Sequence, residues 1–322
     1  MRFLALLQSG FIGLLFAMSI AAPPALAQTP RGCSSKEISQ GFEEFGRTGT
    51  MPADLGRWLA DPKAQYIEPY KAFDNVWYVG VCWVSAWIVK TSDGAILIDT
   101  LHDPFAGQLI DNIRKVGVDP KDIKYVFMTH GHFDHTGGAY KLKPLTAAQF
   151  VMTQRGWDEA VASARASENT PRRWTMIAPD RVAKDGDVFR LGDQEVQVLE
   201  TPGHTWGTAS YLFKVKDGDK TYRAITVGGL GLNAIGSSSQ VQAYIDSVDR
   251  LTALMASPAT QVQVHLTTHP FSNGLTEAAR KIPARKPGEP HPLVDPQGFV
   301  QQLNGLRAGA VERLAIEKSR GR

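Results

Sequence analysis

Three histidines and an aspartate fall within six residues of this chain, in the segment His130-Gly131-His132-Phe133-Asp134-His135. Side chains two residues apart in an extended loop share a face, so His130 and His132 point to one position. Asp134 and His135 can turn toward a second position. Imidazole nitrogen and carboxylate oxygen are usual zinc ligands, and a catalytic zinc keeps one coordination position open for water. The spacing therefore predicts two neighbouring metal positions, completed by ligands from elsewhere in the chain.

Two histidines from distant parts of the chain have a suitable context. His204 and His269 each follow a predicted strand and precede a tight turn, where the edge of a sheet can meet the first loop. A lone histidine after a strand is often only hydrogen-bonded, and that is the alternative for both. We assign one ion to His130, His132 and His204, and the other to Asp134, His135 and His269.

The other histidines are expected to have lesser roles. Asp99 and His102 follow an apolar strand near the same edge, so both are candidates for outer hydrogen-bond partners of the ligands. The alternative for Asp99 is a turn residue. His265 alternates within an apolar stretch and is expected to be a strand residue. His291 lies in a proline-rich stretch and is expected to face solvent.

The rest of the chain reads as two series of short strands, each with helices. Strands are predicted at 75–81, 84–90 and 95–99, then 123–128, 150–153, 188–191, 195–200, 209–215, 222–227 and 262–266. Helices are predicted over 104–116, with Asp103 as N-cap and Gly117 closing it, and over 157–164, 240–255 and 296–316. Residues 28–73 read as an irregular lead. Two strand-rich sets with helices outside predict one α/β (α+β) domain over 28–322.

The first 27 residues differ from the rest of the chain. Arg2 is their only charge, residues 11–22 are mostly apolar, and Ala25-Leu26-Ala27 fits a small-x-small cleavage site. This pattern predicts a signal peptide over 1–27 and a periplasmic or secreted protein. A membrane anchor is the alternative, but the apolar run is interrupted and is short for a span of about 20 residues. We therefore expect no stable membrane anchor.

Charge limits the classes of ligand that the protein can bind, and the cysteine content allows one disulfide. The formal net charge is +3, and no basic stripe with interleaved aromatic residues is present, so we expect a small-molecule substrate and no nucleic acid. Cys33 and Cys82 are the two cysteines of the chain. Two thiols in an oxidising compartment can pair, and we predict a disulfide if their Cα atoms lie within about 7 Å.

The His-x-His-x-Asp-His run at 130–135, together with His204 after Pro-Gly and His269, resembles the metallo-β-lactamase superfamily over roughly residues 73–306. The resemblance implies an αββα sandwich of two mixed sheets with helices on the outer faces and a dinuclear site at the sheet edges. Five histidines and one aspartate without a cysteine look like the third subclass of class B β-lactamases. That resemblance implies two Zn²⁺ ions, a metal-bridging hydroxide as nucleophile, and Asp134 as the catalytic residue that orients it.

One stretch departs from that subclass. It usually has Asp-Ser-Leu-Ser after the corresponding strand, with serines that help to hold the substrate carboxylate, and this chain has Gly228-Gly229-Leu230-Gly231. We expect substrate contacts at Gly229, Gly231 and Asn233. Gly228 also stands where glyoxalase II-like and many lactonase-like relatives carry a metal-bridging aspartate, which argues against those groups.

The predicted function is zinc-dependent hydrolysis of the β-lactam amide bond, the chemistry of antibiotic resistance. Hydrolysis of another ester, lactone or amide is the alternative, because a fold alone does not specify a substrate. A non-catalytic binding module on this fold is a third reading. An intact ligand set argues against it, because such a module would be free to lose those residues.

Overall fold

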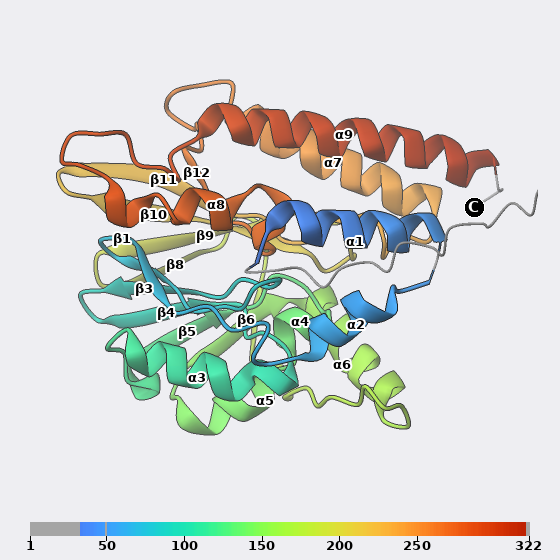
Figure 1. Ribbon diagram of the computed structural model, residues 1–322, viewed down its shortest axis with the longest axis horizontal. Coiled ribbons are helices and arrows are strands. Elements are labelled where there is room, and N and C mark those ends of the chain that lie inside the picture. The colour runs from blue at the N-terminus through green and yellow to red at the C-terminus, as the bar shows by residue number, and fades with distance from the viewer. Residues whose placement is uncertain (1–32, 49, 320–322) are drawn as a thin grey trace, which may run out of the picture.

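Two mixed β-sheets pack face to face with helices on their outer sides (Figure 1). The computed structural model describes residues 33–48 and 50–319, so the predicted signal peptide lies outside the described residues. This architecture confirms the predicted αββα sandwich. No helix in the described part of the chain is long and apolar enough to cross a membrane.

The first sheet has the strand order β1-β2-β3-β4-β5-β6-β7. Its strands are β1 (Tyr70–Phe73), β2 (Val76–Tyr78), β3 (Trp87–Thr91), β4 (Gly94–Ile98), β5 (Ile123–Phe127), β6 (Gln149–Thr153) and β7 (Arg181–Ala183). Strands β1 to β4 pair antiparallel, and β4 to β7 pair parallel. Parallel neighbours need crossover connections, so their carboxyl ends, and the loops that follow them, meet at one edge.

The second sheet has the order β12-β11-β10-β9-β8. Its strands are β8 (Val188–Leu191), β9 (Gln194–Glu200), β10 (Ala209–Asp217), β11 (Lys220–Thr226) and β12 (Val264–His265). Strands β8 to β11 pair antiparallel, and β12 adds in parallel to β11. The β9–β10 connection and the segment after β12 therefore leave this sheet at neighbouring places.

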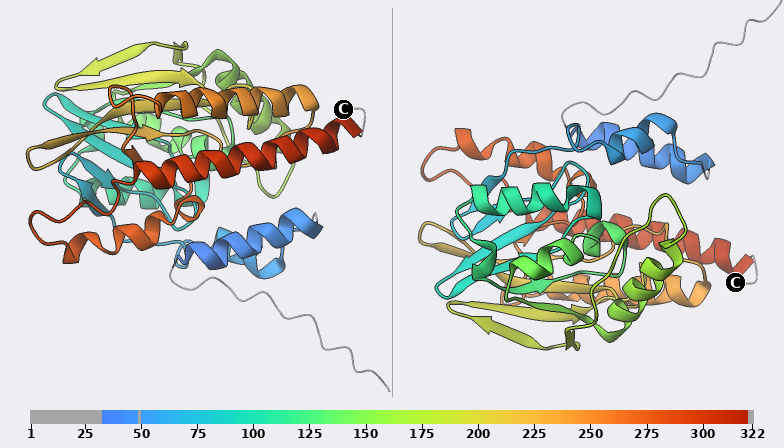
Figure 2. Two further views of the ribbon diagram at one scale, coloured as in Figure 1. Left: turned by 90° about the horizontal axis from the view of Figure 1, so that it is seen from above. Right: turned by 90° about the horizontal axis from the view of Figure 1, so that it is seen from below.

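The helices cover the two outer faces and one side of the sandwich. They are α1 (Ser35–Thr48), α2 (Ala53–Ala60), α3 (Ala106–Lys115), α4 (Phe133–Thr136), α5 (Ala139–Leu142), α6 (Gln154–Ser167), α7 (Ser238–Leu254), α8 (Leu275–Ala279) and α9 (Pro296–Ser319). Helices α3 and α5 lie along the first sheet and α7 and α9 along the second (Figure 1). Helix α1 packs at the side of the sandwich beside α8 (Figure 2).

The apolar runs of the central strands reflect burial on both faces. In β4, Ile96 and Ile98 pack between the sheets in one core cluster with Tyr211 of β10, whereas Leu97 packs toward α3 with Leu109. A strand that is covered on both faces carries apolar residues continuously instead of alternately. This explains why residues 95–98 are apolar throughout and why the strand could be predicted from the sequence.

Two local predictions were wrong. Residues 28–73, expected to be irregular, contain α1, α2 and β1 within their described part. Asp103 does not cap α3: it begins a 3-10 turn with Pro104, α3 starts only at Ala106, and Asp103 instead pairs with Lys141 at 3.1 Å. Gly117 does close the helix, with φ at +73° and its N–H donating to the Arg114 carbonyl.

Two further predictions concern Cys33, Cys82 and His291. The structure joins Cys33 and Cys82 in a disulfide with a Cα–Cα distance of 5.1 Å, which confirms the predicted pairing. His291 is only 4% exposed and stacks on Phe73 with ring centroids 4.1 Å apart, so the expected solvent-facing position was wrong. A flat aromatic partner provides an apolar surface that the composition of the proline-rich stretch did not indicate.

Candidate metal centre

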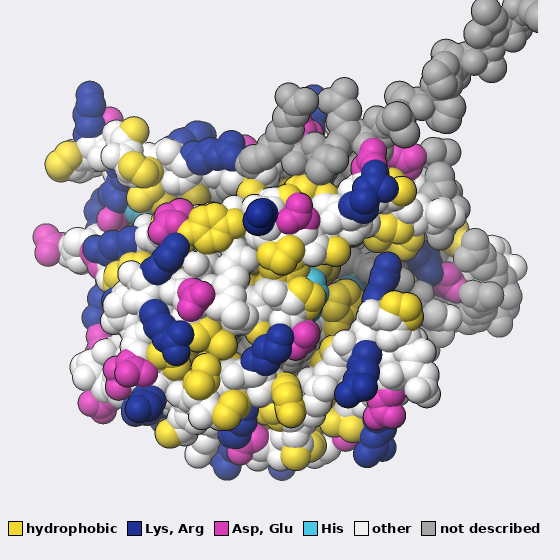
Figure 3. Space-filling view, turned by 60° about the horizontal axis from the view of Figure 1, so that its bottom comes forward, with side chains coloured by type: hydrophobic (Ala, Val, Ile, Leu, Met, Phe, Trp, Pro, Cys, Tyr) yellow, Lys and Arg dark blue, Asp and Glu magenta, His cyan; other side chains and the backbone are white. Residues whose placement is uncertain are grey.

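All six predicted ligands come together where loops leave the two sheets. His130 and His132 follow β5, Asp134 and His135 lie in α4, His204 lies between β9 and β10, and His269 follows β12. Histidine side chains are visible in a hollow of the surface, with apolar and basic side chains around it (Figure 3). The donor atoms form two groups, each of three residues with its atoms within 4.8 Å of one another.

The first ligand set consists of His130, His132 and His204. Nδ1 of His132 lies 3.1 Å from Nε2 of His130 and 3.0 Å from Nε2 of His204. Around a tetrahedral zinc ion with bonds of about 2.0 to 2.1 Å, ligand nitrogens are about 3.3 Å apart. The three ring nitrogens therefore have the convergence that a metal ion of this size requires.

The second ligand set consists of Asp134, His135 and His269. Nε2 of His135 lies 3.3 Å from Oδ2 of Asp134 and 3.3 Å from Nε2 of His269. The remaining side of the triangle, from Asp134 Oδ2 to His269 Nε2, is 3.8 Å. One carboxylate oxygen and two imidazole nitrogens suit a divalent cation that accepts mixed nitrogen and oxygen donors.

The outer ring nitrogens of the second set are held by other elements. Nδ1 of His135 lies 2.8 Å from Oδ2 of Asp99, and Nδ1 of His269 lies 2.6 Å from the Trp83 carbonyl oxygen. Because these acceptors take the Nδ1 proton, Nε2 keeps its lone pair toward the centre. The structure confirms Asp99 as an outer partner, whereas sequence reasoning missed Trp83.

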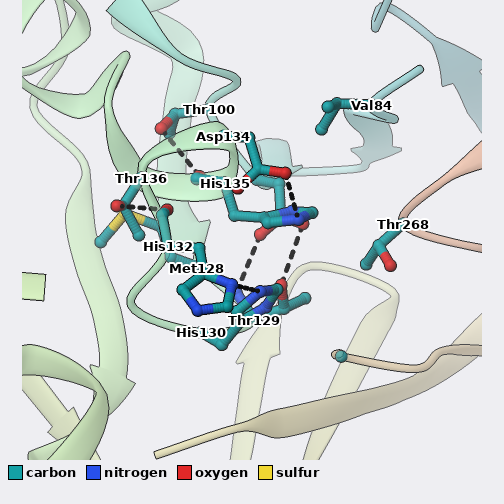
Figure 4. A network of polar contacts seen from close by, with 12 residues as sticks. Val84, Thr100, Met128, Thr129, His130, His132, Asp134, His135, Thr136 and Thr268 are labelled. Carbon is teal, nitrogen blue, oxygen red and sulfur yellow. Dashed lines mark hydrogen bonds and ion pairs between the residues drawn. The ribbon is translucent and has the colours of Figure 1, made fainter. Parts of the chain in front are cut away.

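The first set is anchored in the same way. His204 Nδ1 donates to the Gly231 carbonyl at 2.6 Å, and His130 Nδ1 lies 3.1 Å from the Thr129 hydroxyl. That hydroxyl donates to Asp99 at 3.0 Å, so its lone pairs can accept from His130. The polar contacts run from one ligand set to the other through Thr129 and Asp99 (Figure 4 shows part of this network).

Burial keeps most of these imidazoles neutral. It lowers the pKa of His204 to about 3 and that of His269 to about 4, and it holds the pKa of His130 well below the ordinary value. A buried cation is disfavoured unless negative charge compensates it. Each of these rings therefore offers a lone pair, as a metal ligand must.

Charge compensation is concentrated in the second set. Burial alone lowers the pKa of His135, but the carboxylates of Asp134 and Asp99 outweigh it and raise the value to about 10. Burial likewise opposes ionisation of Asp134, but the neighbouring His135 holds its pKa well below the usual range. The site is arranged for positive charge next to two carboxylates, which a metal cation can supply in place of a proton.

The glycines expected to contact substrate lie against a ligand. Gly229 has φ at +63°, and a Cβ on it would overlap the Cβ of His204. Gly231 supplies the carbonyl that accepts from His204, and exposed Asn233 lies on the same loop. Contact of these residues with substrate stays a prediction. The structure gives Gly229 a second reason to be glycine, which is the close packing of the His204 side chain.

Gly228 and His102 also have defined surroundings. A Cβ at Gly228 would overlap the Ala209 carbonyl oxygen, so an aspartate does not fit there. His102 is buried and packs edge-on against Trp83 and Phe105, and its Nδ1 has no hydrogen-bond partner among the described residues. The outer-partner role considered for His102 belongs instead to Asp99.

Comparison with known sequences identifies similar proteins. Residues 79–217 match the family model of the metallo-beta-lactamase superfamily. A hydroxyacylglutathione hydrolase of Rhodospirillum rubrum is 29% identical over 182 residues, which cover 52% of this chain and 62% of that protein. An acyl-coenzyme A thioesterase of Homo sapiens is 28% identical over 196 residues, covering 52% of this chain and 67% of that protein. The match thus spans less than two thirds of the bacterial relative's length.

Solved structures match over more of the chain. A subclass B3 metallo-beta-lactamase of Bradyrhizobium japonicum superposes with a TM-score of 0.71 and 28% identity, covering 80% of this chain and 97% of that one. The metallo-beta-lactamase GOB-18 of Elizabethkingia meningoseptica gives a TM-score of 0.64 and 26% identity, covering 78% and 93%. The shared fold therefore covers about four fifths of this chain.

Proposed function

We propose that this chain, which carries a metallo-β-lactamase superfamily domain, opens the amide bond of β-lactams with two zinc ions held by its two ligand sets. The observation that supports this most strongly is the pair of three-residue donor groups, in each of which the donor atoms lie within 4.8 Å of one another. Most of the histidine rings in these groups are oriented by a hydrogen bond from the ring nitrogen that faces away from the centre.

The donor chemistry of the centre suits zinc. Five imidazoles and one carboxylate provide nitrogen and oxygen, and both cysteines are committed to the disulfide. Bound zinc ions would supply an acidified water and electrophilic assistance to the carbonyl and the leaving nitrogen. No side-chain nucleophile is then needed for hydrolysis.

The chain's own contribution is orientation and proton handling. Asp134 is ionised, because His135 holds the pKa of its carboxyl far below the usual range. An ionised carboxylate only accepts hydrogen bonds, so it can fix the O–H of an attacking water and point its lone pair at the carbonyl. We assign Asp134 this orienting role in addition to its place in the second ligand set.

We expect β-lactam turnover to be inefficient. The loop at 228–231 offers backbone N–H groups in place of serine hydroxyls to the substrate carboxylate. A hydrogen bond to a charged group contributes about 1.5 to 3 kcal/mol. At about 1.4 kcal/mol per tenfold, two missing donors weaken binding in the transition state by roughly two to four powers of ten.

A thioester or ester hydrolase is the second candidate. The names of the curated relatives favour it, since one is a hydroxyacylglutathione hydrolase and another an acyl-coenzyme A thioesterase. Gly228 does not separate the two candidates, because the aspartate that has no room there is expected both in glyoxalase II-like relatives and at the start of the Asp-Ser-Leu-Ser stretch of the β-lactamase subclass. The two candidates share the metal centre and differ in the substrate.

The deciding experiment compares two substrate classes on one preparation. Purified protein, reconstituted with zinc, is tested with nitrocefin, benzylpenicillin and a carbapenem, and in parallel with S-lactoylglutathione and an acyl-coenzyme A. We expect zinc-dependent opening of β-lactams with a high KM. Turnover of the thioesters alone would replace the first candidate by the second, and no turnover of either class would overturn both.

We also propose that the protein is exported after removal of residues 1–27. The composition of this segment supports export, and so does the Cys33–Cys82 disulfide, because such bonds persist in oxidising compartments. N-terminal sequencing of protein from the periplasmic fraction is expected to begin at Gln28. An intact Met1 on the mature protein would contradict export by cleavage.

A further inference from the structure

We infer that Glu159 of α6 is a positioning residue for the first ligand set. Its carboxylate holds the loop of His204 on the same turn of helix that supports the loop of His130 and His132. The inference rests on the metal centre of the proposed function. It adds a residue that is neither a ligand nor a hydrogen-bond partner of one.

The attachment of the His204 loop to α6 is direct. Oε1 of Glu159 accepts from the Trp206 N–H at 2.8 Å, and Oε2 accepts from the Gly207 N–H at 3.0 Å. Both oxygens of one carboxylate are thus committed to consecutive amides, two and three residues after His204. Hydrogen bonds to an ionised acceptor are shorter and stronger than neutral ones. The Thr153 hydroxyl adds a third tie by donating to the Gly207 carbonyl at 2.7 Å.

The loop between His130 and His132 rests on the same stretch of helix. A Cβ on Gly131 would lie 2.7 Å from the Ala160 backbone nitrogen and 3.0 Å from the Glu159 Cβ. A Cβ on Gly207 would likewise overlap the Gly156 backbone. Both ligand loops therefore pack closely against the same stretch of α6, to which Glu159 belongs. Glu159 thus acts on this ligand set through its two hydrogen bonds to the backbone that follows His204.

The second ligand set has different supports. Its outer partners are Asp99, after β4, and the carbonyl of Trp83, before β3. Neither of these supports belongs to α6, so loosening the α6 contact is expected to affect one metal ion and spare the other. Loss of an outer-shell partner typically lowers metal affinity about 10- to 100-fold.

The test is Glu159→Gln, with Asp158→Asn as the matched control. The glutamine keeps the shape but loses the charge and turns an NH₂ toward a backbone N–H. Asp158 is the next residue on the same helix, carries the same charge, and contacts Gln154 at 2.9 Å. Zinc affinity of each apoprotein is measured by competition with a chromophoric chelator, and Co²⁺ absorption spectra report the ligand geometry.

We expect Glu159→Gln to bind one zinc ion 10- to 100-fold more weakly and the other normally, with a changed Co²⁺ spectrum. Asp158→Asn is expected to match wild type. Equal affinities and spectra for Glu159→Gln and wild type would overturn the inference, and so would equal losses in both variants, which would indicate a general charge effect. A wild-type protein that binds no zinc would instead overturn the proposed function.

A folding defect is recognised separately. Far-ultraviolet circular dichroism and thermal unfolding of the apoproteins show whether Glu159→Gln retains the fold. If it does not, Glu159→Asp takes its place, because it keeps the charge but is one methylene too short for both amides. That variant is expected to weaken the same zinc ion, and unchanged affinity would overturn the inference.

Discussion

Asp99 holds His135 at a distance of 2.8 Å between Oδ2 and Nδ1, and both side chains are completely buried. Asp99 follows β4 with a left-handed backbone, φ +61°, which a non-glycine residue keeps only where its surroundings fix it. The fixing contact is the Thr129 N–H, which donates to Oδ1 at 2.8 Å. A ligand of the second set is thus oriented by a residue of another strand end.

Replacing Asp99 by asparagine is expected to weaken zinc binding to the second ligand set about 10- to 100-fold. The amide has one acceptor oxygen and cannot accept from both Thr129 and His135 as the carboxylate does. Stepwise zinc titration of the apoprotein measures the affinity of each ligand set, and the larger loss is expected at the second, because Asp99 reaches the first only through Thr129. Two unchanged affinities would show that Asp99 does not tune the centre.

Chelation and the substitution His132→Ala are each expected to abolish hydrolysis. His132 Nδ1 lies within 3.1 Å of both other nitrogens of the first ligand set, so its removal opens the set. The matched control is His265→Gln, which removes a buried histidine outside both sets. Hydrolysis is measured with nitrocefin after zinc reconstitution. Full activity of His132→Ala would place the reaction at another site.

Gly229→Ala is expected to lower both stability and zinc binding to the first ligand set. The left-handed backbone costs a residue with a Cβ about 1 to 2 kcal/mol, and the methyl group would displace His204. Gly236→Ala in the same loop is the control, because a Cβ there meets nothing within 4 Å. The free energy of unfolding and zinc affinity are measured for both. Equal behaviour of the two variants would refute the packing argument.

Acid is expected to destabilise the apoprotein through His265. Burial lowers its pKa to about 4, against 6.5 for an ordinary histidine. Between these two pKa values the unfolded chain binds more protons than the folded chain, so the free energy of unfolding falls as the pH falls. Above pH 6.5 His265 is neutral in both states and causes no loss of stability. The contribution is about 1.4 kcal/mol per pH unit, roughly 3 kcal/mol in all. Urea unfolding is measured between about pH 7 and 4. The free energy of unfolding of His265→Gln should depend less steeply on pH than that of wild type, and equal slopes for the two proteins would contradict the prediction.

Removing the disulfide is expected to cost about 4 kcal/mol of unfolding free energy, by the entropy of the loop that it closes. Cys33 and Cys82 are 49 residues apart in the sequence. The measurement is urea unfolding of the apoprotein, comparing wild type with the double variant Cys33→Ala, Cys82→Ala. Wild type under a thiol reductant provides the second comparison. A difference below about 1 kcal/mol would mean that the constraint on the unfolded chain is small.

Local sequence patterns predicted the central strands and the ligand loop. The apolar runs at 95–99 and 123–128 correspond to β4 and β5, because a strand between two layers has apolar residues on both faces. The same approach missed α1 and α2. Short helices are marginal alone and depend on packing. Trp58 of α2 belongs to the apolar core cluster, and Phe42 of α1 stacks on Phe271, far away in the sequence.

The sequence alone determined that the four donors between His130 and His135 lie close together, since all of them belong to one loop and one short helix. Only the tertiary structure decided how the sets are completed. His204 meets His132 across 72 residues, and His269 meets His135 across 134. Two outer partners, at Trp83 and Gly231, are backbone carbonyls. Every residue has that group, so no sequence pattern reports it, and only the packing of the two sheets brings it to a ligand.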